Sequence, residues 1–412
     1  MDPYRLHLLR GGILSFASSL VWTAMLVYQV QVIGMTPLQL VLAGTTMEIT
    51  IFLFEIPTGV VADVYSRRLS TIIGYATLGV SYLVQGLIPA FGAILAGNAL
   101  WGLGYTFTSG AYDAWLADEI GAQNVGNAFL RGSQVDRITA LAGIILAAIF
   151  GSAILALPIV LGGVIMIALA VLLVVVMPET GFKPKPRGER ATWHTYSSTL
   201  RDGIRVTRRQ PVLMALLLMT FFFGLFSEGW DRLWQAQFLR TFALEAVIPF
   251  PAIVFFAILR GAGMILGVGL AELARRKVNM KDPAKVNRAL FWLVSLMVGG
   301  LLAFAAAPGV LVGLAAYFTF TQARELTDPF LRTWTNQHIP EGSSVRATVL
   351  SLQSQAHAIG EVAGGPPVGL IGDTSLRLAF VGSAIFLTPV LAILRRVRRY
   401  DTQAAAPAGE TP

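Results

Sequence analysis

Four stretches of this chain contain no charged residue, and their lengths limit the possible folds more than any other feature. They are Gly11–Met47, Leu69–Tyr112, Ile138–Pro178 and Ala289–Ala323, which run 37, 44, 41 and 35 residues. A helix needs about 20 apolar residues to cross the hydrocarbon core of a bilayer, so each stretch is long enough for two crossings. Charged residues make up 13% of the 412 residues, against roughly 25% in soluble domains. The composition excludes a soluble domain, a disordered chain and a coiled coil, and it predicts a polytopic α-helical membrane protein.

Gly and Pro clusters divide each of these stretches in two, and four further apolar segments contain isolated charges. The twelve expected spans cover residues 11–33, 38–61, 69–89, 91–114, 134–153, 156–177, 211–236, 250–273, 288–307, 309–331, 346–371 and 377–395. We expect an all-α fold of two pseudo-symmetric six-helix bundles, residues 1–177 and 211–396. A linker at 178–210, with an amphipathic segment near Trp193–Arg209, joins them, and residues 397–412 form a disordered tail.

The positions of Lys and Arg orient the spans. Counted over alternate loops, 26 of the 31 Lys and Arg residues fall on one side, and Arg240 and Arg377 fall on the other. Cytoplasmic loops carry the excess of positive charge, so both termini and the linker are expected in the cytoplasm. Arg outnumbers Lys by 26 to 5, which is typical of a GC-rich bacterium. The expected location is a bacterial inner membrane.

Several classes of function lack their sequence signals. The chain has no cysteine, so disulfides, thiolate zinc sites and cysteine nucleophiles are excluded. The H-E-x-x-H, G-x-S-x-G and P-loop patterns do not occur, and the net charge of +8 lies in short loops rather than in a patch for nucleic acid. We expect no enzyme, no cofactor, no metal and no nucleic-acid partner.

The two halves of the chain share a weak internal repeat. Three matches occur in the same order in both halves, with offsets of 209, 215 and 221 residues. They pair Asp63 with Glu272, Asp113 with Asp328, and Gly143 with Gly364. Duplicated six-span units that place a site near the bilayer midplane are typical of secondary transporters.

The loop between the second and third spans contains the one recognisable motif. The segment Gly59–Arg68 resembles the G-x-x-x-D-x-x-G-R-[RK] signature of the major facilitator superfamily, with Ser66 in place of the usual Gly. We expect Gly59 to permit close packing and Asp63 to face a helix N-terminus. Arg67 and Arg68 are expected to reach the acids Asp118 and Glu119, and the group then forms a gate at the cytoplasmic side. The alternative is that both Arg residues only satisfy the positive-inside rule.

Within the superfamily, the drug/proton antiporters are the nearest resemblance, and it implies a monomer that exports a lipophilic or cationic compound in exchange for protons. Two of their features are absent. Asn98 stands four residues before Gly102 where those antiporters have Arg, and the Gly-Pro signature of span five is missing, although Gly365–Gly369 contains a similar run in span eleven. Proton-coupled uptake of a small polar solute such as a sugar or metabolite is the alternative.

Acidic residues inside spans are the expected proton carriers. A charge at the bilayer centre costs about 2.5–3.5 kcal/mol or more, and desolvation lets a carboxyl bind and release protons near neutral pH. Glu55 is the first candidate, Asp113 the second and Glu48 the third. The alternative for Glu55 is a structural role. In it, the side chain forms hydrogen bonds with backbone groups that Pro57 leaves without a helical partner.

The remaining candidates are expected to line a substrate cavity. They are Trp22, Gln29, Asn98, Trp101, Tyr105, Arg260, Arg324, Glu325, Asp328, His357 and Glu361. Aromatic walls with a few polar groups suit a largely apolar ligand, and the excess of acids over bases disfavours an anion. A packing pair is the alternative for His357 and Glu361. Glu228, Asp231 and Arg232, near the outer end of span seven, are expected to pair structurally, and Trp230 is expected in the interfacial belt.

Overall fold

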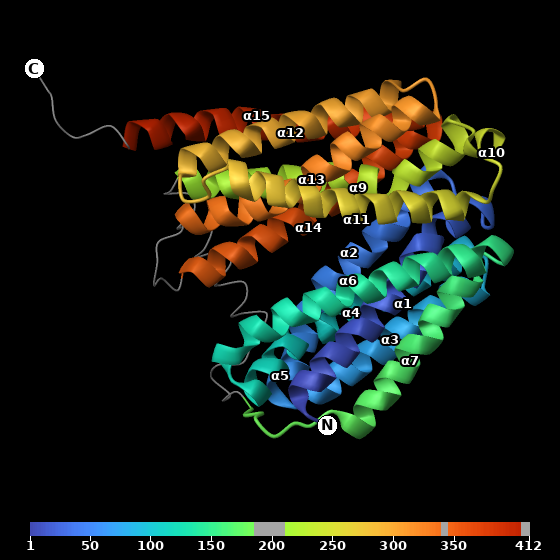
Figure 1. Cartoon of the computed structure of the whole chain (residues 1–412), viewed down its shortest axis with the longest axis vertical. Helices are drawn as coiled ribbons and strands as arrows, with labels where there is room; N and C mark the ends of the chain where they lie inside the picture. The colour runs from blue at the N-terminus through green and yellow to red at the C-terminus, as the bar shows by residue number, and fades with distance from the viewer. Residues whose placement is uncertain (185–210, 339–344, 405–412) are drawn as a thin grey trace, which may run out of the picture. The chain divides into compact units, whose positions relative to one another are not determined.

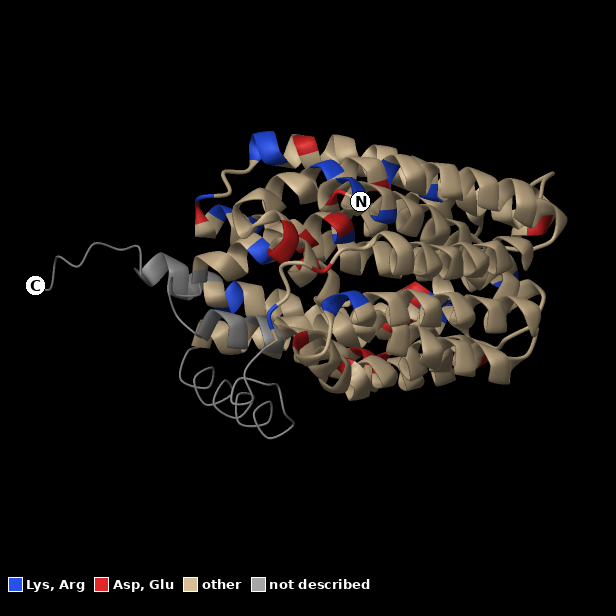
Figure 2. Ribbon diagram, turned by 90° about the horizontal axis from the view of Figure 1, so that it is seen from below, with Lys and Arg blue, Asp and Glu red and all other residues tan. Residues whose placement is uncertain are grey.

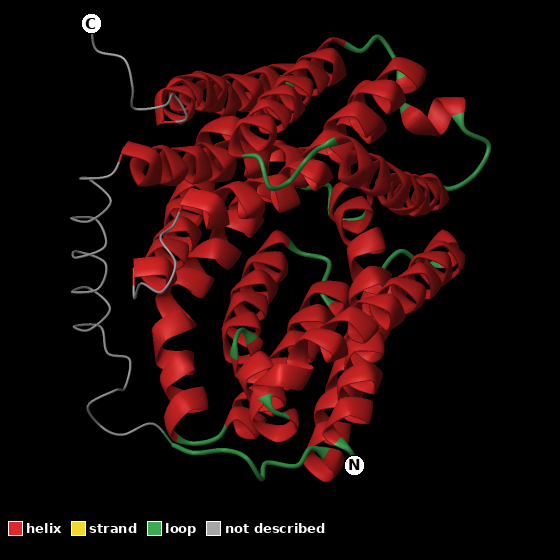
Figure 3. Cartoon of the chain, turned by 60° about the vertical axis from the view of Figure 1, so that its left-hand side comes forward, coloured by secondary structure: helices red, strands yellow, loops and turns green. Residues whose placement is uncertain are grey.

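The computed structural model describes residues 1–184, 211–338 and 345–404, and these are helical nearly throughout (Figure 1). No strand occurs among them (Figure 3). The first group of helices is α1 (Pro3–Gln31), α2 (Pro37–Val64), α3 (Arg67–Leu87), α4 (Phe91–Thr108), α5 (Ala111–Ile120), α6 (Ala122–Ala153) and α7 (Leu157–Val176). The second group is α9 (Pro211–Ala236), the π-helix η2 (Gln237–Thr241), α10 (Leu244–Val247), α11 (Ala252–Lys277), α12 (Pro283–Ala306), α13 (Val310–His338), α14 (Val345–Thr374) and α15 (Leu376–Ala404).

Twelve of the helices in the described ranges contain 18 residues or more, one for each expected span. Eight of them are long and apolar enough to cross a membrane by length and composition alone. The other four are α3, α4, α13 and α14, whose sequences hold more glycine, polar or charged residues. The all-α fold with twelve long helices agrees with the prediction.

The expected fourth span differs from the structure. Residues 91–114 are not one helix, because the chain breaks after α4 and resumes as α5. Gly110 at the break has a φ of +73°, a left-handed conformation that glycine adopts without the steric cost of a side chain. The break places Asp113 in the first turn of α5 instead of near the end of a continuous span.

Local signals explain where several helices begin. Ser66 precedes α3, and its hydroxyl accepts a hydrogen bond from the backbone N–H of Leu69 (2.8 Å). Thr36 and Gln39 form a capping box at the start of α2, where Pro37 is the first helical residue. Such N-caps stabilise a helix by about 1 kcal/mol each. The Ser that replaces the usual Gly of the motif is therefore the N-cap of α3.

The helices group into two compact units, Met1–Tyr196 with Ile248–Gly261, and Ser197–Val247 with Ala262–Pro412. In the first unit, α1 packs against α6 and α7, while α3 packs against α4 and α7. The second unit repeats these pairings with the helices at corresponding places in the chain, because α9 packs against α14 and α15, and α12 packs against α13 and α15. The repeated pairings are those expected of two pseudo-symmetric six-helix bundles.

Glycines allow the closest of these helix contacts. A Cβ on Gly143 of α6 would overlap the carbonyl oxygen of Phe16 in α1, and a Cβ on Gly364 of α14 would overlap that of Leu225 in α9. These two glycines are the pair matched in the sequence repeat. Their shared role supports the alignment of the two halves, since both sit where the fifth helix of a bundle meets the first.

The unit boundaries differ from the expected bundle limits in two places. Residues 248–261, which include the beginning of α11, group with the first unit. The last helix, α15, continues to Ala404, so residues 397–404 of the expected tail are helical. The expected amphipathic segment near Trp193–Arg209 and the last eight residues of the tail lie outside the described residues.

Charged residues lie mainly toward one end of the helices, and long uncharged stretches remain elsewhere (Figure 2). In the first unit, the loops at the two ends of α2 differ in this way. The α2–α3 turn carries Arg67 and Arg68, while residues 32–36 before α2 carry no charge. In the second unit, Arg275, Arg276 and Lys277 end α11.

Candidate functional site

The turn between α2 and α3 is the centre of a polar cluster at one end of the first unit. Arg67 forms an ion pair with Asp118 of α5, as the motif predicts, and its guanidinium also donates to the carbonyl oxygen of Ala114 (2.8 Å). The Arg67 and Asp118 side chains are 15% and 28% exposed. The pair joins the start of α3 to the last turn of α5.

Two glutamates complete this cluster, one of which the sequence did not single out. Glu179, just after α7, accepts hydrogen bonds from the Ser66 hydroxyl (2.6 Å) and from the backbone N–H of Arg68 (2.9 Å). Glu119 of α5 accepts bonds from the backbone N–H groups of Thr180 (2.6 Å) and Gly181 (2.8 Å) and from the Thr180 hydroxyl (2.7 Å). The two carboxylates bind the chain after α7 to α3 and α5. We call the residues Ser66, Arg67, Arg68, Asp118, Glu119, Glu179 and Thr180 the turn cluster.

The environment of Glu119 favours its ionised form. Burial raises the pKa of this carboxyl, but the hydrogen bonds from Gly181 and Thr180 outweigh it and leave the pKa below its ordinary value. Bonds donated to a carboxylate stabilise its charge. Glu119 therefore stays negative at neutral pH and keeps its three bonds.

Two members of the expected gate, Arg68 and Gly59, have different surroundings from those predicted. Arg68 does not pair with Glu119, because its guanidinium donates to the carbonyl oxygen of Val174 in α7. No atom of the described residues lies within 4 Å of the place that a Cβ on Gly59 would occupy, so close packing does not explain that glycine. Asp63 is half-buried in the last turn of α2.

The three expected proton carriers differ in burial. Glu48 is half-buried on α2, whereas Glu55 on the same helix and Asp113 on α5 are exposed. Asp113 lies in the first turn of a helix, where the helix dipole favours a negative charge.

The aromatic and amide candidates of the first unit lie on α1 and α4, and three of them are in contact. Trp22 contacts Trp101 edge to face at 5.8 Å, and Trp101 is stacked on Tyr105 at 5.4 Å. Asn98 is 3% exposed and donates to the side chain of Gln85 (3.3 Å) and to the Ile94 carbonyl (2.9 Å). Gln29, on α1, is also 3% exposed. The Trp22 and Trp101 rings remain half-buried.

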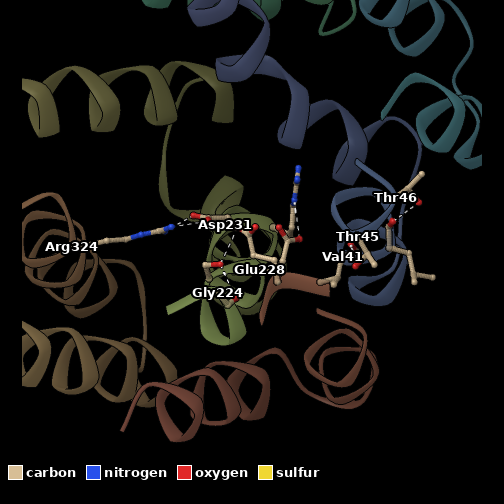
Figure 4. A network of polar contacts seen from close by, with 11 residues as sticks. Val41, Thr45, Thr46, Gly224, Glu228, Asp231 and Arg324 are labelled. Atoms are coloured by element: carbon tan, nitrogen blue, oxygen red, sulfur yellow. Dashed lines mark hydrogen bonds and ion pairs between the residues drawn. The ribbon is translucent and has the colours of Figure 1, made fainter. Parts of the chain in front are cut away.

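The second unit contains a set of linked charges at the middle of α9. Glu228 and Arg232 form an i,i+4 ion pair (3.3 Å) and are 3% and 9% exposed. On the same helix, Asp231 accepts two hydrogen bonds from the guanidinium of Arg324 in α13, one of them 2.8 Å long (Figure 4). The Ser227 hydroxyl lies 3.4 Å from Glu361 of α14.

His357 and Glu361 extend these contacts along α14. Their side chains form an i,i+4 pair with 3.3 Å between Nδ1 and Oε2, as the spacing predicts. Close helix contact brings them to α9, since a Cβ on Gly224 would overlap the carbonyl oxygen of His357. We call this set the α9 array: Ser227, Glu228, Asp231, Arg232, Arg324, His357 and Glu361.

Glu228 and Arg232, expected to pair near the outer end of span seven, do pair, and both are buried. α9 ends at Ala236, as expected, and the π-helix η2 continues from it to Thr241. At 1.5 Å per residue, Glu228 lies about 20 Å before that end. Trp230 is likewise 3% exposed, and its ring packs against Phe320 (4.0 Å) and Phe304 (5.2 Å) in an aromatic core instead of a membrane-interface belt.

Asp328, Glu325 and Arg260 are the other candidates of the second half. Asp328 is exposed and pairs with Arg332 one turn later on α13 (3.1 Å). Glu325 is exposed beside Gly267 of α11. Arg260, on α11, is half-buried.

Near the start of α1, the structure buries a second set of polar side chains. No motif or charge within a span points to them in the sequence. Nε2 of His7 donates to the carbonyl oxygen of Ala128 (3.2 Å), which leaves Nδ1 to accept from the Tyr112 hydroxyl (3.2 Å). The Arg10 guanidinium donates to the Tyr75 hydroxyl and lies 3.7 Å from the centre of the Tyr112 ring. His7 and Arg10 precede the first charge-free stretch and resemble ordinary flanking residues in the sequence. Only the fold shows that they are packed inside.

Comparison with known proteins decides the family. Residues 9–365 match the Major Facilitator Superfamily. The chain is a member of the Major Facilitator Superfamily. It is 22% identical over 351 residues, 85% of each chain, to the uncharacterized MFS-type transporter YxaM of Bacillus subtilis (strain 168). As a superfamily member it is a membrane transporter.

Solved structures of transporters share the fold of this superfamily member. The D323A mutant of the nucleoside transporter NupG superposes with a TM-score of 0.74 at 11% identity, over 95% of this chain and 99% of that one. A bacterial homolog of the human lysosomal transporter Spinster, in an inward-facing and unoccupied conformation, gives 0.71 at 15% identity, over 98% of each chain. A POT family transporter in complex with a thioalcohol-conjugated peptide gives 0.70 at 12% identity, over 97% and 96%. At these identities the likeness establishes the fold alone.

Proposed function

We propose that this transporter exports a lipophilic or cationic small molecule and that the α9 array couples export to protons. The observation that carries the coupling is the charge balance of the array. It contains three carboxyl groups, Glu228, Asp231 and Glu361, but only two guanidinium groups, those of Arg232 and Arg324. With His357 neutral, one bound proton makes the array neutral.

Protonation of this array is linked to conformation because the cost of its net charge depends on whether water reaches it. An unbalanced charge in a low-dielectric interior is costly, so the array favours one bound proton when it is closed to water. It releases that proton when water reaches its carboxyl groups. Glu228 is 3% exposed and Glu361 is 15% exposed, so these are the carboxyls we assign to the proton. Glu55, Asp113 and Glu48 remain predicted carriers of the first unit.

The proposed substrate class is supported by the side chains of the first unit. Trp22, Trp101 and Tyr105 supply aromatic surface with few polar groups, which suits a largely apolar ligand. The acids of α2, Glu48 and Glu55, disfavour an anion. In this proposal the turn cluster is the cytoplasmic gate of an alternating-access cycle.

Reconstituted protein tests the coupling with ethidium as the probe. In proteoliposomes containing the pH dye pyranine, an outward ethidium gradient should drive proton movement in the opposite direction. Glu228→Gln and Glu361→Gln should each reduce this proton flux at least tenfold while ethidium exchange at equal pH persists. Glu55→Gln tests the predicted carrier of the first unit in the same way.

Glu272→Gln is the matched control, because Glu272 pairs with Arg275 and Arg276 at the end of α11, apart from the array. Its proton flux should equal that of the unsubstituted protein. Full ethidium-driven proton flux in both Glu228→Gln and Glu361→Gln would remove the α9 array from the mechanism. Loss of folding is checked by size-exclusion chromatography of each variant.

Uptake of a small polar solute is the alternative direction and substrate. The buried amides Gln29 and Asn98 favour it, since buried polar groups are suited to hydrogen-bond a polar ligand. Cells that express the chain should lose ethidium faster than control cells if it is an exporter. Proton-dependent accumulation of a radiolabelled sugar, nucleoside or dipeptide, with ethidium loss unchanged, would replace export by uptake.

A further inference from the structure

Two aromatic rings on α4 form a parallel stack. Trp101 and Tyr105 are one helical turn apart, and their ring planes differ by 8° with 5.4 Å between the centroids. Trp22 of α1 meets the Trp101 ring edge to face, at 79° and 5.8 Å. We call Trp22, Trp101 and Tyr105 the Trp101 stack. Its three rings come from two helices of the same unit.

The stack is held in place by buried neighbours. The indole Nε1–H of Trp101 donates to the Tyr82 hydroxyl (3.0 Å), and Tyr82 on α3 is 1% exposed. Backbone contact fixes α4 on α3 as well, because a Cβ on Gly104 would lie 2.9 Å from the carbonyl oxygen of Gly74. A ligand that binds to the stack therefore meets rings that are already oriented, which lowers the entropy cost of binding.

Tyr105 leaves ring surface for a further group. Its side chain is 42% exposed although one ring face covers Trp101. Two other faces of α4 are packed against neighbouring helices, since Gly104 meets α3 and Gly102 meets α2. The contact between Trp101 and Trp22 directs the stack toward α1. An aromatic ligand placed on Tyr105 would continue the stack in the offset geometry that aromatic pairs prefer.

One acidic residue of α2, Glu48, lies at the level of the stack. A Cβ on Gly102 would lie 2.7 Å from the carbonyl oxygen of Met47, so α2 crosses α4 one residue away from both Glu48 and Trp101. Glu55 follows Glu48 after about two helical turns on the same face. Carboxylates and the faces of aromatic rings both attract cations.

We propose that the Trp101 stack is a binding subsite for a planar aromatic cation, with the ligand ring placed against Tyr105 and its charge toward α2. The inference rests on the proposed function, because it names the substrate class and the residues that contact it. It extends that function by requiring a flat aromatic surface in the ligand, which lipophilicity alone does not require.

Equilibrium binding to purified full-length protein tests this subsite without any gradient. Ethidium is the planar aromatic cation, and binding is followed by its fluorescence anisotropy. Tyr105→Leu and Trp101→Ala should each weaken ethidium binding about tenfold, while Tyr105→Phe, which keeps the ring, should change it less than twofold. Trp101→Phe, which keeps a ring but loses the bond to Tyr82, should lie between.

Two controls separate the subsite from general effects. Trp292→Ala removes a Trp that is 62% exposed on α12 of the other unit, and it should leave ethidium binding unchanged. The flat anion 1-pyrenesulfonate should bind at least tenfold more weakly than ethidium, and Glu48→Gln should reduce that difference. Thermal unfolding of each variant checks that the loss is not a loss of fold.

Either of two results overturns the proposal. One is no binding of ethidium to the unsubstituted protein, or equal binding by it and by Tyr105→Leu and Trp101→Ala. The other is equal affinity for ethidium and 1-pyrenesulfonate. Because binding is measured at equilibrium, failure of proton coupling in the liposome assay leaves this result intact, and failure here leaves the coupling assay interpretable with another substrate.

Discussion

The Asp231–Arg324 pair combines both features of a strong ion pair, two parallel hydrogen bonds and a partly buried setting. Arg324 donates through both terminal nitrogens, and the two side chains are 33% and 41% exposed. Two-point bonding of this kind is more specific than a single contact. The same geometry means that either partner left alone retains a poorly solvated charge.

We expect Asp231→Asn to lower the stability of the purified protein more than the double change Asp231→Asn with Arg324→Gln. The single change strands the guanidinium, whereas the double change removes both charges. Residues in direct contact typically couple by about 0.5–3 kcal/mol, and their partial exposure places this pair near the lower end. Thermal unfolding of the two single variants and the double variant measures the coupling, and additive effects would contradict it.

The lowered pKa of Glu119 predicts that its contribution to stability depends on pH. Its pKa is lowered in the folded state, so its stabilising effect is present above the unfolded pKa and is lost as pH falls through the folded pKa. Glu119→Gln should therefore lower the melting temperature at pH 7, by about 2 °C or less because the group is largely exposed. The difference from the unsubstituted protein should vanish near pH 3, and a difference that grows toward low pH would contradict it.

Individual side chains were predictable from the sequence where a short spacing fixes the geometry. His357 and Glu361 are such a pair. Arg67 and Asp118 are 51 residues apart, and their pairing was predictable only from the resemblance of the motif. No sequence pattern connects Glu179 with Ser66, because 113 residues separate them and only the fold brings them together. The burial of Glu228 was missed because the helices that cover α9, which are α14 and α15, lie more than 100 residues further along the chain.

At the level of whole helices, close packing through glycine is the main contact between neighbouring helices. In the first unit, Gly79 of α3 and Gly163 of α7 face each other, and a Cβ on either would lie within 3 Å of the carbonyl oxygen of the other. In membranes, packing of small residues is a principal source of helix association. Gly224, Gly360 and Gly364 play the same part between α9 and α14.

The substitution Gly364→Ala tests the role of glycine in packing α9 against α14. The new methyl group would overlap the Leu225 carbonyl oxygen, so α9 and α14 must separate, and the α9 array is expected to lose the Ser227–Glu361 contact. We expect a fall in melting temperature of several degrees and reduced proton coupling. Gly299→Ala on α12 is the control, since no atom of the described residues lies within 4 Å of its Cβ position, and it should be neutral or stabilising by up to about 1 kcal/mol. Equal melting of the two variants would contradict the packing role.

The existence of the helices was easier to predict than their ends. Charge-free stretches and Gly or Pro breaks located one long helix for every expected span, because a bilayer demands long apolar segments. The break between α4 and α5 was missed, since Gly110 lies inside an uncharged run that hydropathy alone reads as continuous. Gly110 adopts a left-handed conformation there, and a span count does not contain backbone conformation.

At the scale of the whole molecule, charge distribution predicts orientation. The absence of cysteine lets a single introduced thiol report its side of the membrane. Ala90→Cys, in the exposed turn before α4, should react with a membrane-impermeant maleimide in intact cells. Ala122→Cys, exposed at the start of α6, should react only after permeabilisation. The reverse pattern would place both termini outside and would remove the turn cluster from the cytoplasmic side.

The turn cluster predicts how the balance between conformations of the transporter shifts when its two Arg side chains are removed. Arg67→Ala with Arg68→Ala removes the bonds to Asp118, Ala114 and Val174, so the state in which the cluster is closed loses stability. Partly exposed pairs contribute up to about 1 kcal/mol each, which corresponds to about a fivefold change in the ratio of two conformations. In inside-out vesicles, maleimide labelling of Ala114→Cys, which is half-buried beside Arg67, should rise by about that factor. Ala122→Cys, which is already exposed, should label as before. Restoring the pair in reverse, with Arg67→Asp and Asp118→Arg, should recover part of the protection. Unchanged labelling in the double alanine variant would show that Arg67 and Arg68 serve only to orient the chain.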